Sequence, residues 1–175
     1  YTREDQGSEG EGALSLSPGN IVNGKMDYKS STYITWYKYE ESPEIKIFNG
    51  DILFCKTGST VGKVSVVDNL PYKATINPQL VVLKEIKVNS KFLAYTLATF
   101  KIQLLVKGLA GVGSVPNISQ AKLNEIKVAI PTQSEQSRIV SILDQFEASI
   151  ANLEAQLKER EKQYEYYRNQ LLTFE

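Results

Sequence analysis

The feature that most constrains this chain is a long segment without helix breakers at its C-terminal end. Residues 132–175 contain neither glycine nor proline, and their apolar residues recur at alternating spacings of three and four. That spacing is the heptad pattern of a coiled coil, in which one side of the helix packs against a partner helix. The expected seam consists of Leu143, Phe146, Ile150, Leu153, Leu157, Arg160, Tyr164, Tyr167 and Leu171.

A helix over residues 133–173 is roughly 60 Å long at a rise of 1.5 Å per residue. The preceding residues, 1–131, are enough for one domain roughly 35–40 Å across. Such a domain cannot cover the whole apolar seam, so the helix needs a partner helix. Thr132, placed after Pro131 and three residues before Glu135, is the expected N-cap in a capping box. We therefore expect a globular domain over 1–131 and a spacer helix over 132–175.

The globular part is predicted to be α+β and rich in strands. Strands are expected at 51–55, 63–67 and 79–83, where β-branched and apolar residues are concentrated. Ser90 is the expected N-cap of a helix that ends at Gly108, and a short helix at 119–126 and a strand at 127–130 follow. The first fifty residues show too little periodicity for an assignment. The residues expected on the inner face of the helix after Ser90 are Phe92, Leu93, Leu97, Phe100, Leu104 and Leu105.

The composition excludes several kinds of chemistry. The chain has no histidine and one cysteine, which removes Ser-His and Cys-His nucleophile pairs and the common zinc sites. We therefore expect no catalytic residues and no metal site, and a protein that is not itself an enzyme. Cys55 lies in an apolar run and is expected to be buried, and a single cysteine favours a reducing compartment such as the cytoplasm. No apolar run approaches the roughly 18 residues that span a bilayer, so no membrane partner is expected.

The net charge is zero, but the charges are distributed unevenly. Residues 44–127 contain eleven lysines and five acidic residues, whereas residues 1–43 and 128–175 each have an acidic excess of three. A basic middle segment suits a surface that faces phosphates. A lysine-rich solvated face explains the charge pattern equally well.

A glycine-rich turn, Gly58-Ser59-Thr60-Val61-Gly62-Lys63, is similar to part of a phosphate-binding P-loop. That motif requires glycine where Thr57 stands, serine or threonine where Val64 stands, and a helix after the loop. The turn instead leads into an expected strand, so we do not predict nucleotide binding. Its hydroxyls and lysines suit contacts with DNA bases and phosphates, and an ordinary hairpin loop is the plainer interpretation.

Two further loops have a composition suited to DNA. The first, 71–79, combines Tyr, Lys, Asn and Gln, and the second runs from Lys107 through three glycines to Ser114. Amide side chains can pair with adenine, and glycines let a backbone approach a ligand closely. Plain polar loops are equally compatible with both sequences. The candidate DNA-binding residues are Lys56, Thr57, Ser59, Lys63, Tyr72, Lys73, Asn77, Gln79, Lys107 and Ser114.

An aromatic cluster precedes these loops. It contains Tyr33, Trp36, Tyr37 and Tyr39. Such a cluster serves either as half-buried core or as a stacking surface for bases, and the core interpretation is favoured.

The order of several short motifs resembles the specificity subunits of type I restriction-modification systems. The motifs are Asn49-Gly50-Asp51-Ile52-Leu53-Phe54 with the glycine turn, Val115-Pro116-Asn117-Ile118-Ser119, Val128-Ala129-Ile130-Pro131, and Glu135-Gln136-Ser137-Arg138-Ile139-Val140 with Leu143-Asp144. The resemblance covers roughly residues 46–175. It implies a target-recognition domain that reads one half of a bipartite site in double-stranded DNA, followed by the spacer helix of the family.

The resemblance also implies partners. It predicts methyltransferase (M) subunits, restriction (R) subunits, and a second half-unit or a second copy that pairs through an antiparallel coiled coil. It places S-adenosylmethionine, ATP and Mg on the partner subunits, with no cofactor in this chain, and implies the cytoplasm of a prokaryote. Only one such unit is present, so a half-subunit or a piece of a two-unit subunit is expected, with a natural N-terminus upstream. A coiled-coil assembly module whose globular head binds protein or carbohydrate is the alternative.

Overall fold

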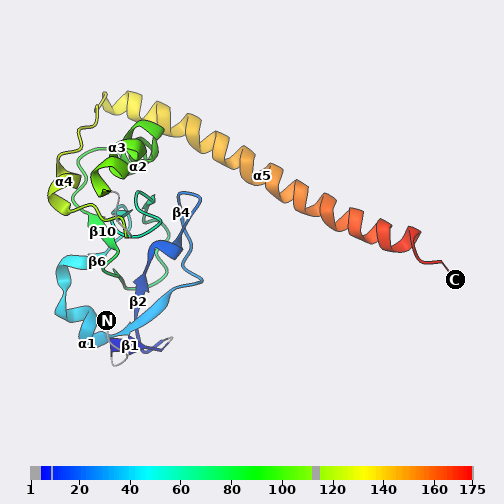
Figure 1. Cartoon of the computed structure of the whole chain (residues 1–175), viewed down its shortest axis with the longest axis horizontal. Helices are drawn as coiled ribbons and strands as arrows, with labels where there is room; N and C mark the ends of the chain where they lie inside the picture. Colours follow the sequence, from blue (N-terminus) through cyan, green and yellow to red (C-terminus); the bar gives the residue numbers. More distant parts are fainter. Residues whose placement is uncertain (1–4, 9, 112–114, 175) are drawn as a thin grey trace. The chain divides into compact units, whose positions relative to one another are not determined.

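The computed structural model describes residues 5–8, 10–111 and 115–174, and the chain divides into two compact units, Tyr1–Pro131 and Thr132–Glu175 (Figure 1). The first unit is strand-rich and the second is one helix, which confirms the α+β class. The strands are β1 (Gln6–Gly7), β2 (Gly12–Leu16), β3 (Ile21–Val22), β4 (Lys25–Met26), β5 (Thr32–Thr35), β6 (Lys46–Ile47), β7 (Ile52–Cys55), β8 (Val64–Val66), β9 (Ala74–Ile76) and β10 (Leu80–Leu83).

Helices connect and follow these strands. The α-helices are α1 (Trp36–Glu41), α2 (Ser90–Ala98), α3 (Phe100–Ala110), α4 (Gln120–Asn124) and α5 (Gln133–Leu171), and short 3-10 helices lie at Pro18–Asn20 and Pro43–Ile45. Among the described residues, no single helix is long and apolar enough to cross a membrane. The bent pair formed by α2 and α3 does pass that test of length and composition.

The strands form three sheets. The five-stranded sheet has the order β1-β5-β2-β9-β6, and its β2–β9 pair is parallel while its other pairs are antiparallel. An antiparallel sheet of three strands has the order β10-β7-β8, and β3 pairs with β4. The predicted strands in residues 51–83 are therefore confirmed, with β7 in the centre of its sheet.

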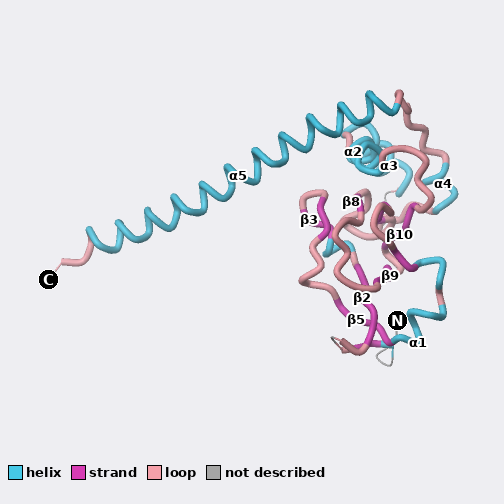
Figure 2. Tube along the Cα trace, turned by 180° about the vertical axis from the view of Figure 1, so that it is seen from behind, coloured by secondary structure: helices cyan, strands magenta, loops and turns pink. Residues whose placement is uncertain are grey.

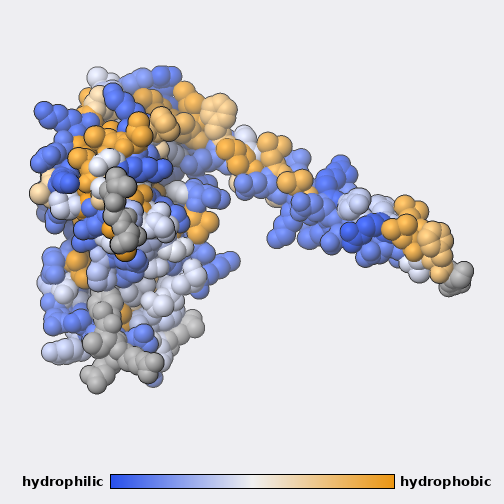
Figure 3. Space-filling model, viewed as in Figure 1, coloured by the Kyte–Doolittle hydropathy of each residue, from blue (hydrophilic) through white to orange (hydrophobic). Residues whose placement is uncertain are grey.

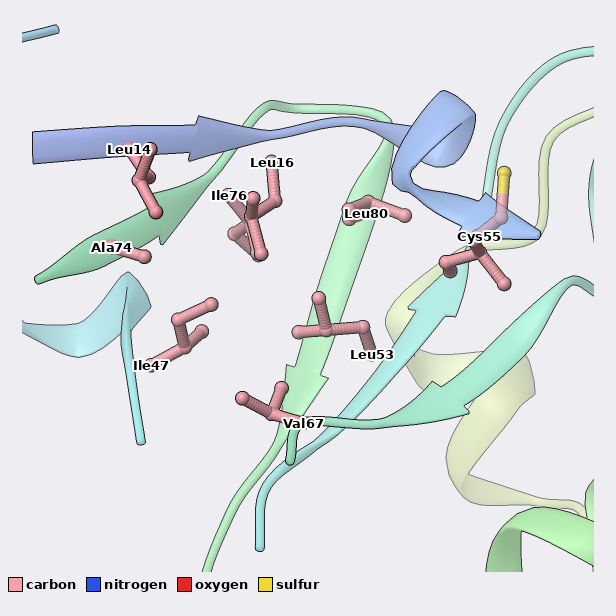
Figure 4. Packing of buried hydrophobic residues seen from close by; sticks show 10 residues of the cluster. Leu14, Leu16, Ile47, Leu53, Cys55, Val67, Ala74, Ile76 and Leu80 are labelled. Atoms are coloured by element: carbon pink, nitrogen blue, oxygen red, sulfur yellow. The ribbon is translucent and has the colours of Figure 1, made fainter. Parts of the chain in front are cut away.

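The central strand β7 is buried on both faces. Leu53 and Cys55 point into a cluster that includes Leu16 and Leu80, and Figure 4 shows these side chains meeting between the two larger sheets. Ile52 and Phe54 belong to a second cluster that contains residues of α2 and α3. Alternate residues of a strand point to opposite faces, which explains why this strand is a continuous apolar run in the sequence. Cys55 is buried, as expected.

The helical region after β10 differs from its prediction. Asn89, not Ser90, is the N-cap and accepts a hydrogen bond from the Phe92 backbone N–H. The single helix expected from Ser90 to Gly108 is two helices, α2 and α3, bent by 67° at Thr99, and α3 continues to Ala110. Figure 2 shows both helices in cyan above the strands of the first unit.

The bend changes which residues of α3 are buried. Ile102 and Val106 face the core, whereas Phe100, Leu104 and Leu105, expected on the inner face, are exposed, Phe100 by 82%. The chain turns at Thr99, whose extended backbone (φ −62°, ψ 146°) ends α2, and the Gln103 side-chain amide donates a hydrogen bond of 2.8 Å to the Leu97 carbonyl oxygen near that end. A carbonyl left without its helical partner is thereby satisfied.

The segment after α3 is only partly as predicted. The short helix at 119–126 is present as α4, with Ser119 as its N-cap. The strand expected at 127–130 is absent from these described residues, and Val128 instead packs against the cluster around Phe54. A partly buried apolar side chain there does not require pairing with another strand.

The predicted long helix is confirmed as α5. Thr132 accepts a hydrogen bond through Oγ1 from the Glu135 backbone N–H, as expected for the N-cap. The Glu135 carboxylate accepts bonds of 2.8 and 2.7 Å from the Arg138 guanidinium, and these bonds lower the pKa of Glu135. The acidic side chain also lies near the positive end of the helix dipole.

Candidate nucleic-acid interface

The glycine turn is a hairpin loop between β7 and β8. The Gly62 backbone N–H donates to the Cys55 carbonyl oxygen, and the Cys55 N–H donates to the Lys63 oxygen, both at 2.8 Å. In its backbone geometry the segment is therefore an ordinary hairpin loop, which is the plainer interpretation of its sequence. A strand, β8, follows the loop, where a P-loop requires a helix.

Two glycines and one glutamine fix the shape of this loop. Gly58 and Gly62 have φ values of 93° and 95°, in the region that favours glycine. The Gln103 side-chain amide donates a 2.9 Å bond to the Gly62 carbonyl oxygen, and a Cβ on Gly62 would lie 2.3 Å from Gln103 Oε1. Ser59 is exposed between the two glycines. The loop is thus held at its base, and Ser59 faces solvent.

Backbone hydrogen bonds join this loop to two other segments. The Lys56 N–H donates to the Gln79 carbonyl oxygen at 2.9 Å, and the Ile118 N–H donates to the Lys56 carbonyl oxygen at 2.9 Å. The Gly58 N–H donates to the Pro116 carbonyl oxygen at 2.8 Å. We call the segments 56–62, 77–79 and 115–118 together the three-loop junction. It gathers Lys56, Thr57, Ser59, Asn77 and Gln79 of the predicted set.

The two amides of the second segment have different environments. Asn77 is half-buried and accepts a hydrogen bond of 3.0 Å through Oδ1 from the Gln79 backbone N–H. Its Nδ2 donates to Gln79 Oε1 at 3.3 Å. Gln79 is exposed. Asn77 therefore shapes the turn, and Gln79 is the amide that faces solvent.

Asn117 belongs to the junction and was missing from the predicted set. It is exposed, and its Oδ1 accepts a 2.7 Å hydrogen bond from Thr57 Oγ1. Its Nδ2 group adds an amide donor beside those of Asn77 and Gln79. The stretch around Asn117 contributed to the family resemblance, but the residue could be identified only through a bond that spans 60 positions.

The lysines near the three-loop junction differ in exposure and in hydrogen bonding. The Asn117 N–H donates to the Ala110 carbonyl oxygen at 3.2 Å, which brings the end of α3 to the junction. Lys107 is exposed in the last turn of that helix. The Lys63 ammonium donates at 3.0 Å to the Ile21 carbonyl oxygen, so it is partly engaged by the protein itself. Ser114 lies outside the described residues.

Tyr72 and Lys73 lie apart from the junction. They precede β9, whereas Asn77 and Gln79 follow it, so the two pairs flank opposite ends of one strand. The Tyr72 ring is 5.8 Å from Trp36, and Lys73 Nζ lies 5.4 Å from the centre of the Trp36 ring. Cation–π contacts of this kind hold an ammonium group near an aromatic face. The structure thus divides the predicted residues into two groups.

The aromatic cluster is mainly core, as favoured. Tyr39 is buried, and Tyr33 and Trp36 are half-buried, whereas Tyr37 is exposed. Burial raises the pKa of the Tyr39 hydroxyl, although the Lys46 ammonium, 4.5 Å from the ring centre, opposes that shift. Tyr37 is the ring in this cluster that is open to a ligand.

A cavity of about 720 Å³ lies beside Tyr72. Burial and the negative charge of Asp68 raise the pKa of Tyr28, in the cavity wall, to about 12. The Tyr28 hydroxyl donates a 2.7 Å hydrogen bond to the Asp68 carbonyl oxygen. The wall consists of Gly10, Leu14, Met26, Asp27, Tyr28, Lys29, Tyr33, Asn69, Pro71 and Tyr72.

The described residues contain no cluster of three histidine, cysteine, aspartate or glutamate side chains that could hold a metal ion. Every buried side-chain nitrogen or oxygen among them has a hydrogen-bond partner. The described residues therefore offer no cluster of side chains for a metal centre.

The predicted seam is exposed along α5. From Phe146 to Leu171 its apolar side chains are 53% to 74% exposed, and Figure 3 shows hydrophobic residues recurring along this helix. Arg160 donates a 2.9 Å hydrogen bond to Gln163 Oε1 on the same helix. Exposed apolar rows with this spacing are typical of helices that pack against another helix.

The fold of this chain, a strand-rich domain and one long helix, is similar to that of solved chains from type I restriction-modification systems. The chain superposes on the S subunit of a type I restriction-modification system from M. genitalium with a TM-score of 0.55 at 20% identity, over 92% of this chain and 42% of that one. A chain from a structure of a type I restriction-modification system gives a TM-score of 0.69 at 19% identity, over 95% and 39%.

Sequence comparison identifies the family. The type I restriction modification DNA specificity domain matches residues 14–162, and the chain belongs to this family. The specificity subunit of the type I restriction enzyme EcoR124I/EcoR124II of Escherichia coli is 30% identical over 164 residues, which are 91% of this chain. The chain spans about 40% of the length of that relative.

Proposed function

We propose that this chain recognises one half of a bipartite sequence in double-stranded DNA and does not itself catalyse a reaction. The three-loop junction is the observation that carries the proposal. It brings exposed donors and acceptors from Ser59, Gln79 and Asn117 onto segments joined by backbone hydrogen bonds, with Lys56 and Lys107 at its edge. Amide and hydroxyl groups can read base edges in the major groove, and lysines can neutralise phosphates.

The second group, Tyr72 and Lys73, supports the same proposal at the other end of β9. Lys73 is exposed, and its ammonium group lies 5.4 Å from the centre of the Trp36 ring, which keeps its charge near the surface. In the proposed complex it contacts a phosphate next to the half-site. Phosphate contacts fix the orientation of the duplex but do not read its sequence.

In this proposal the helix α5 sets the distance to a second recognition unit. It pairs in an antiparallel manner with the helix of a second half-unit or a second copy, and it binds the methyltransferase (M) subunits. Restriction (R) subunits join the same complex. S-adenosylmethionine, ATP and Mg bind those partner subunits, not this chain. The exposed seam of α5 supports the pairing.

Anisotropy with a fluorescent duplex of random sequence, at low and moderate salt, tests DNA recognition by the full chain. We expect binding that weakens steeply with salt, and Lys56→Ala should reduce the slope of log K against log salt by about one unit. Lys158→Ala, which removes an exposed lysine of α5, is the matched control and should leave the slope unchanged. Rounds of selection from the random pool should then enrich a short sequence.

Absence of salt-dependent binding would contradict the proposal. The alternative, an assembly module whose head binds protein or carbohydrate, would then be preferred, because it needs only the exposed seam of α5. Adding the methyltransferase subunit separates the two: a recognition half forms a stable complex with it, detected as an increase in sedimenting mass.

A further inference from the structure

The amide of Gln79 is oriented by the backbone of its own loop. Asn77 Oδ1 accepts a hydrogen bond of 3.0 Å from the Gln79 backbone N–H, which fixes the direction of the Asn77 amide. Asn77 Nδ2 therefore donates to Gln79 Oε1, at 3.3 Å, and Gln79 Nε2 stays unused. A Cβ on Gly58 would lie 3.7 Å from Gln79 Nε2, so this donor lies beside the glycine turn.

Asn117 presents the same kind of group from the third segment of the three-loop junction. Its Oδ1 accepts the 2.7 Å hydrogen bond from Thr57 Oγ1, which leaves Nδ2 as its unused group. Within the described residues, neither Asn117 Nδ2 nor Gln79 Nε2 donates to a protein acceptor. Both side chains are exposed, so two amide donors are available to a ligand.

Acceptors at the junction are less available. Its three segments contain no aspartate or glutamate, and Lys56 adds a side chain that can only donate. Ser59 is the exposed side chain that can both donate and accept. The carbonyl oxygens that already accept a backbone hydrogen bond are those of Lys56, Gly58, Thr60, Asn77, Gln79 and Pro116.

We propose that the three-loop junction reads a guanine of the half-site, with Gln79 Nε2 and Asn117 Nδ2 donating to its N7 and O6 atoms. Guanine presents two acceptors and no donor on its major-groove edge. The inference deepens the proposed function and rests on it, because it names the base that the junction recognises.

The other bases fit this surface less well. An amide pairs with adenine by accepting through its oxygen while it donates through its nitrogen, and here both oxygens already accept protein hydrogen bonds. Cytosine presents a donor, which the amide nitrogens cannot accept. Thymine presents one acceptor and a methyl group, so it leaves one of the two amide donors without a partner.

Conversion of the amides to acids in the full chain tests the proposal. Asn117→Asp keeps the oxygen that accepts from Thr57 and replaces the free donor with an acceptor. Gln79→Glu does the same while keeping the oxygen that accepts from Asn77, and it is a second, independent variant. Gln120→Glu is the matched control, because it makes the same change of charge at an exposed residue of α4, outside the junction.

Selection from a pool of random duplexes, carried out with each protein, gives the first readout. We expect the unmodified chain and Gln120→Glu to enrich a guanine at the same position of the selected sequence. Asn117→Asp and Gln79→Glu should lose that guanine, and cytosine should replace it, since a carboxylate accepts from the cytosine amino group. Thermal unfolding of each variant shows that the fold is retained.

A modified base gives the second readout. In the selected duplex, 7-deazaguanine at that position lacks the N7 acceptor and keeps its pairing with cytosine. We expect it to weaken binding of the unmodified chain about tenfold, a typical cost of losing one base contact. An inosine at the same position keeps N7 and O6, and should leave the affinity unchanged.

The outcomes separate this inference from the proposed function. Enrichment of a sequence in which adenine or thymine stands at the position altered by Asn117→Asp would overturn the inference while DNA recognition stood. An enriched guanine that persists in Asn117→Asp and Gln79→Glu, or that tolerates 7-deazaguanine, would overturn it equally. If no sequence were enriched by the unmodified chain, the proposed function itself would fall, and the inference with it.

Discussion

Thr57 Oγ1 donates a hydrogen bond of 2.7 Å to Asn117 Oδ1, and this bond joins two segments that lie 60 residues apart in the chain. The same two residues form an isolated antiparallel bridge between their backbones. A loop that would otherwise be a simple hairpin is thereby tied to the segment before α4. The geometry of the proposed reading surface depends on this link.

A double-mutant cycle measures the strength of that link. Thr57→Val and Asn117→Ala should each lower the free energy of unfolding, with a coupling of about 0.5–1.5 kcal/mol, the net worth of a typical hydrogen bond. Urea unfolding of the four proteins checks the prediction. Strictly additive effects would show that the hydrogen bond contributes nothing to stability.

Replacing Gly62 and Gly108 with alanine should change the stability of the fold in opposite directions. Gly62→Ala is expected to destabilise the fold by about 1–3 kcal/mol, because its φ is positive and its Cβ would approach Gln103 Oε1. Gly108→Ala is the matched control, since it lies within α3 and its Cβ would meet nothing within 4 Å. That variant should gain about 0.5–1 kcal/mol from helix propensity. Thermal unfolding of both variants gives the comparison, and equal effects would contradict it.

Substitutions at the three-loop junction should distinguish residues that read bases from residues that contact phosphates. Ser59→Ala removes an exposed hydroxyl, so we expect it to reduce discrimination between sequences while leaving the salt slope unchanged. Lys107→Ala should weaken binding to all sequences and reduce the slope by about one unit. Competition between the selected duplex and a random duplex measures both quantities. A salt-slope change in Ser59→Ala would remove Ser59 from the reading residues.

Alkaline pH should destabilise the fold through Tyr28. Its pKa is raised from 10.0 to about 12 in the folded chain, so the neutral hydroxyl is favoured by folding. The contribution is complete below pH 10, the unfolded value, and is lost as the pH rises from 10 to 12. The stability difference between the unmodified chain and Tyr28→Phe should therefore shrink over that range in urea unfolding. A constant difference for Tyr28→Phe over the same range would contradict the role assigned to burial of its hydroxyl.

Strong local patterns predicted the parts of the fold that depend on neighbours in sequence. The heptad spacing indicated the position of α5, and the apolar run 51–55 indicated a strand, which is buried on both faces. The first fifty residues stayed unassigned because their strands are short and depend on distant partners. The parallel pairing of Leu14 with Ala74 is one such contact, since it joins residues 60 positions apart.

The bend at Thr99 was missed for a related reason. The sequence 90–110 is continuously compatible with a helix, and the break is stabilised by Gln103, whose amide binds both the Leu97 and Gly62 carbonyl oxygens. Nothing in the local pattern reveals a side chain that reaches two separate backbone groups. The exposed Phe100 and Leu104 follow from the same bend.

The sequence predicted the residue types of the candidate site, but only part of their arrangement in space. Composition identified Ser59, Gln79 and Lys107, which are exposed, and those residues remain predictions as DNA contacts. It could not show that Tyr72 and Lys73 form a separate group with Trp36, because β9 places them at its opposite end from Gln79. Asn117 needed the three-dimensional link to Thr57 before it could be included.

The three loops of the junction are joined mainly by main-chain atoms, as in the bonds from Lys56 N–H to Gln79 and from Gly58 N–H to Pro116. Such bonds form whichever side chains stand at 56, 59 and 79. Exposed tips can therefore be replaced by mutation or recombination while the framework beneath them persists. A protein built this way can acquire a new preferred sequence without refolding, and differences between related chains would be expected to concentrate at those tips.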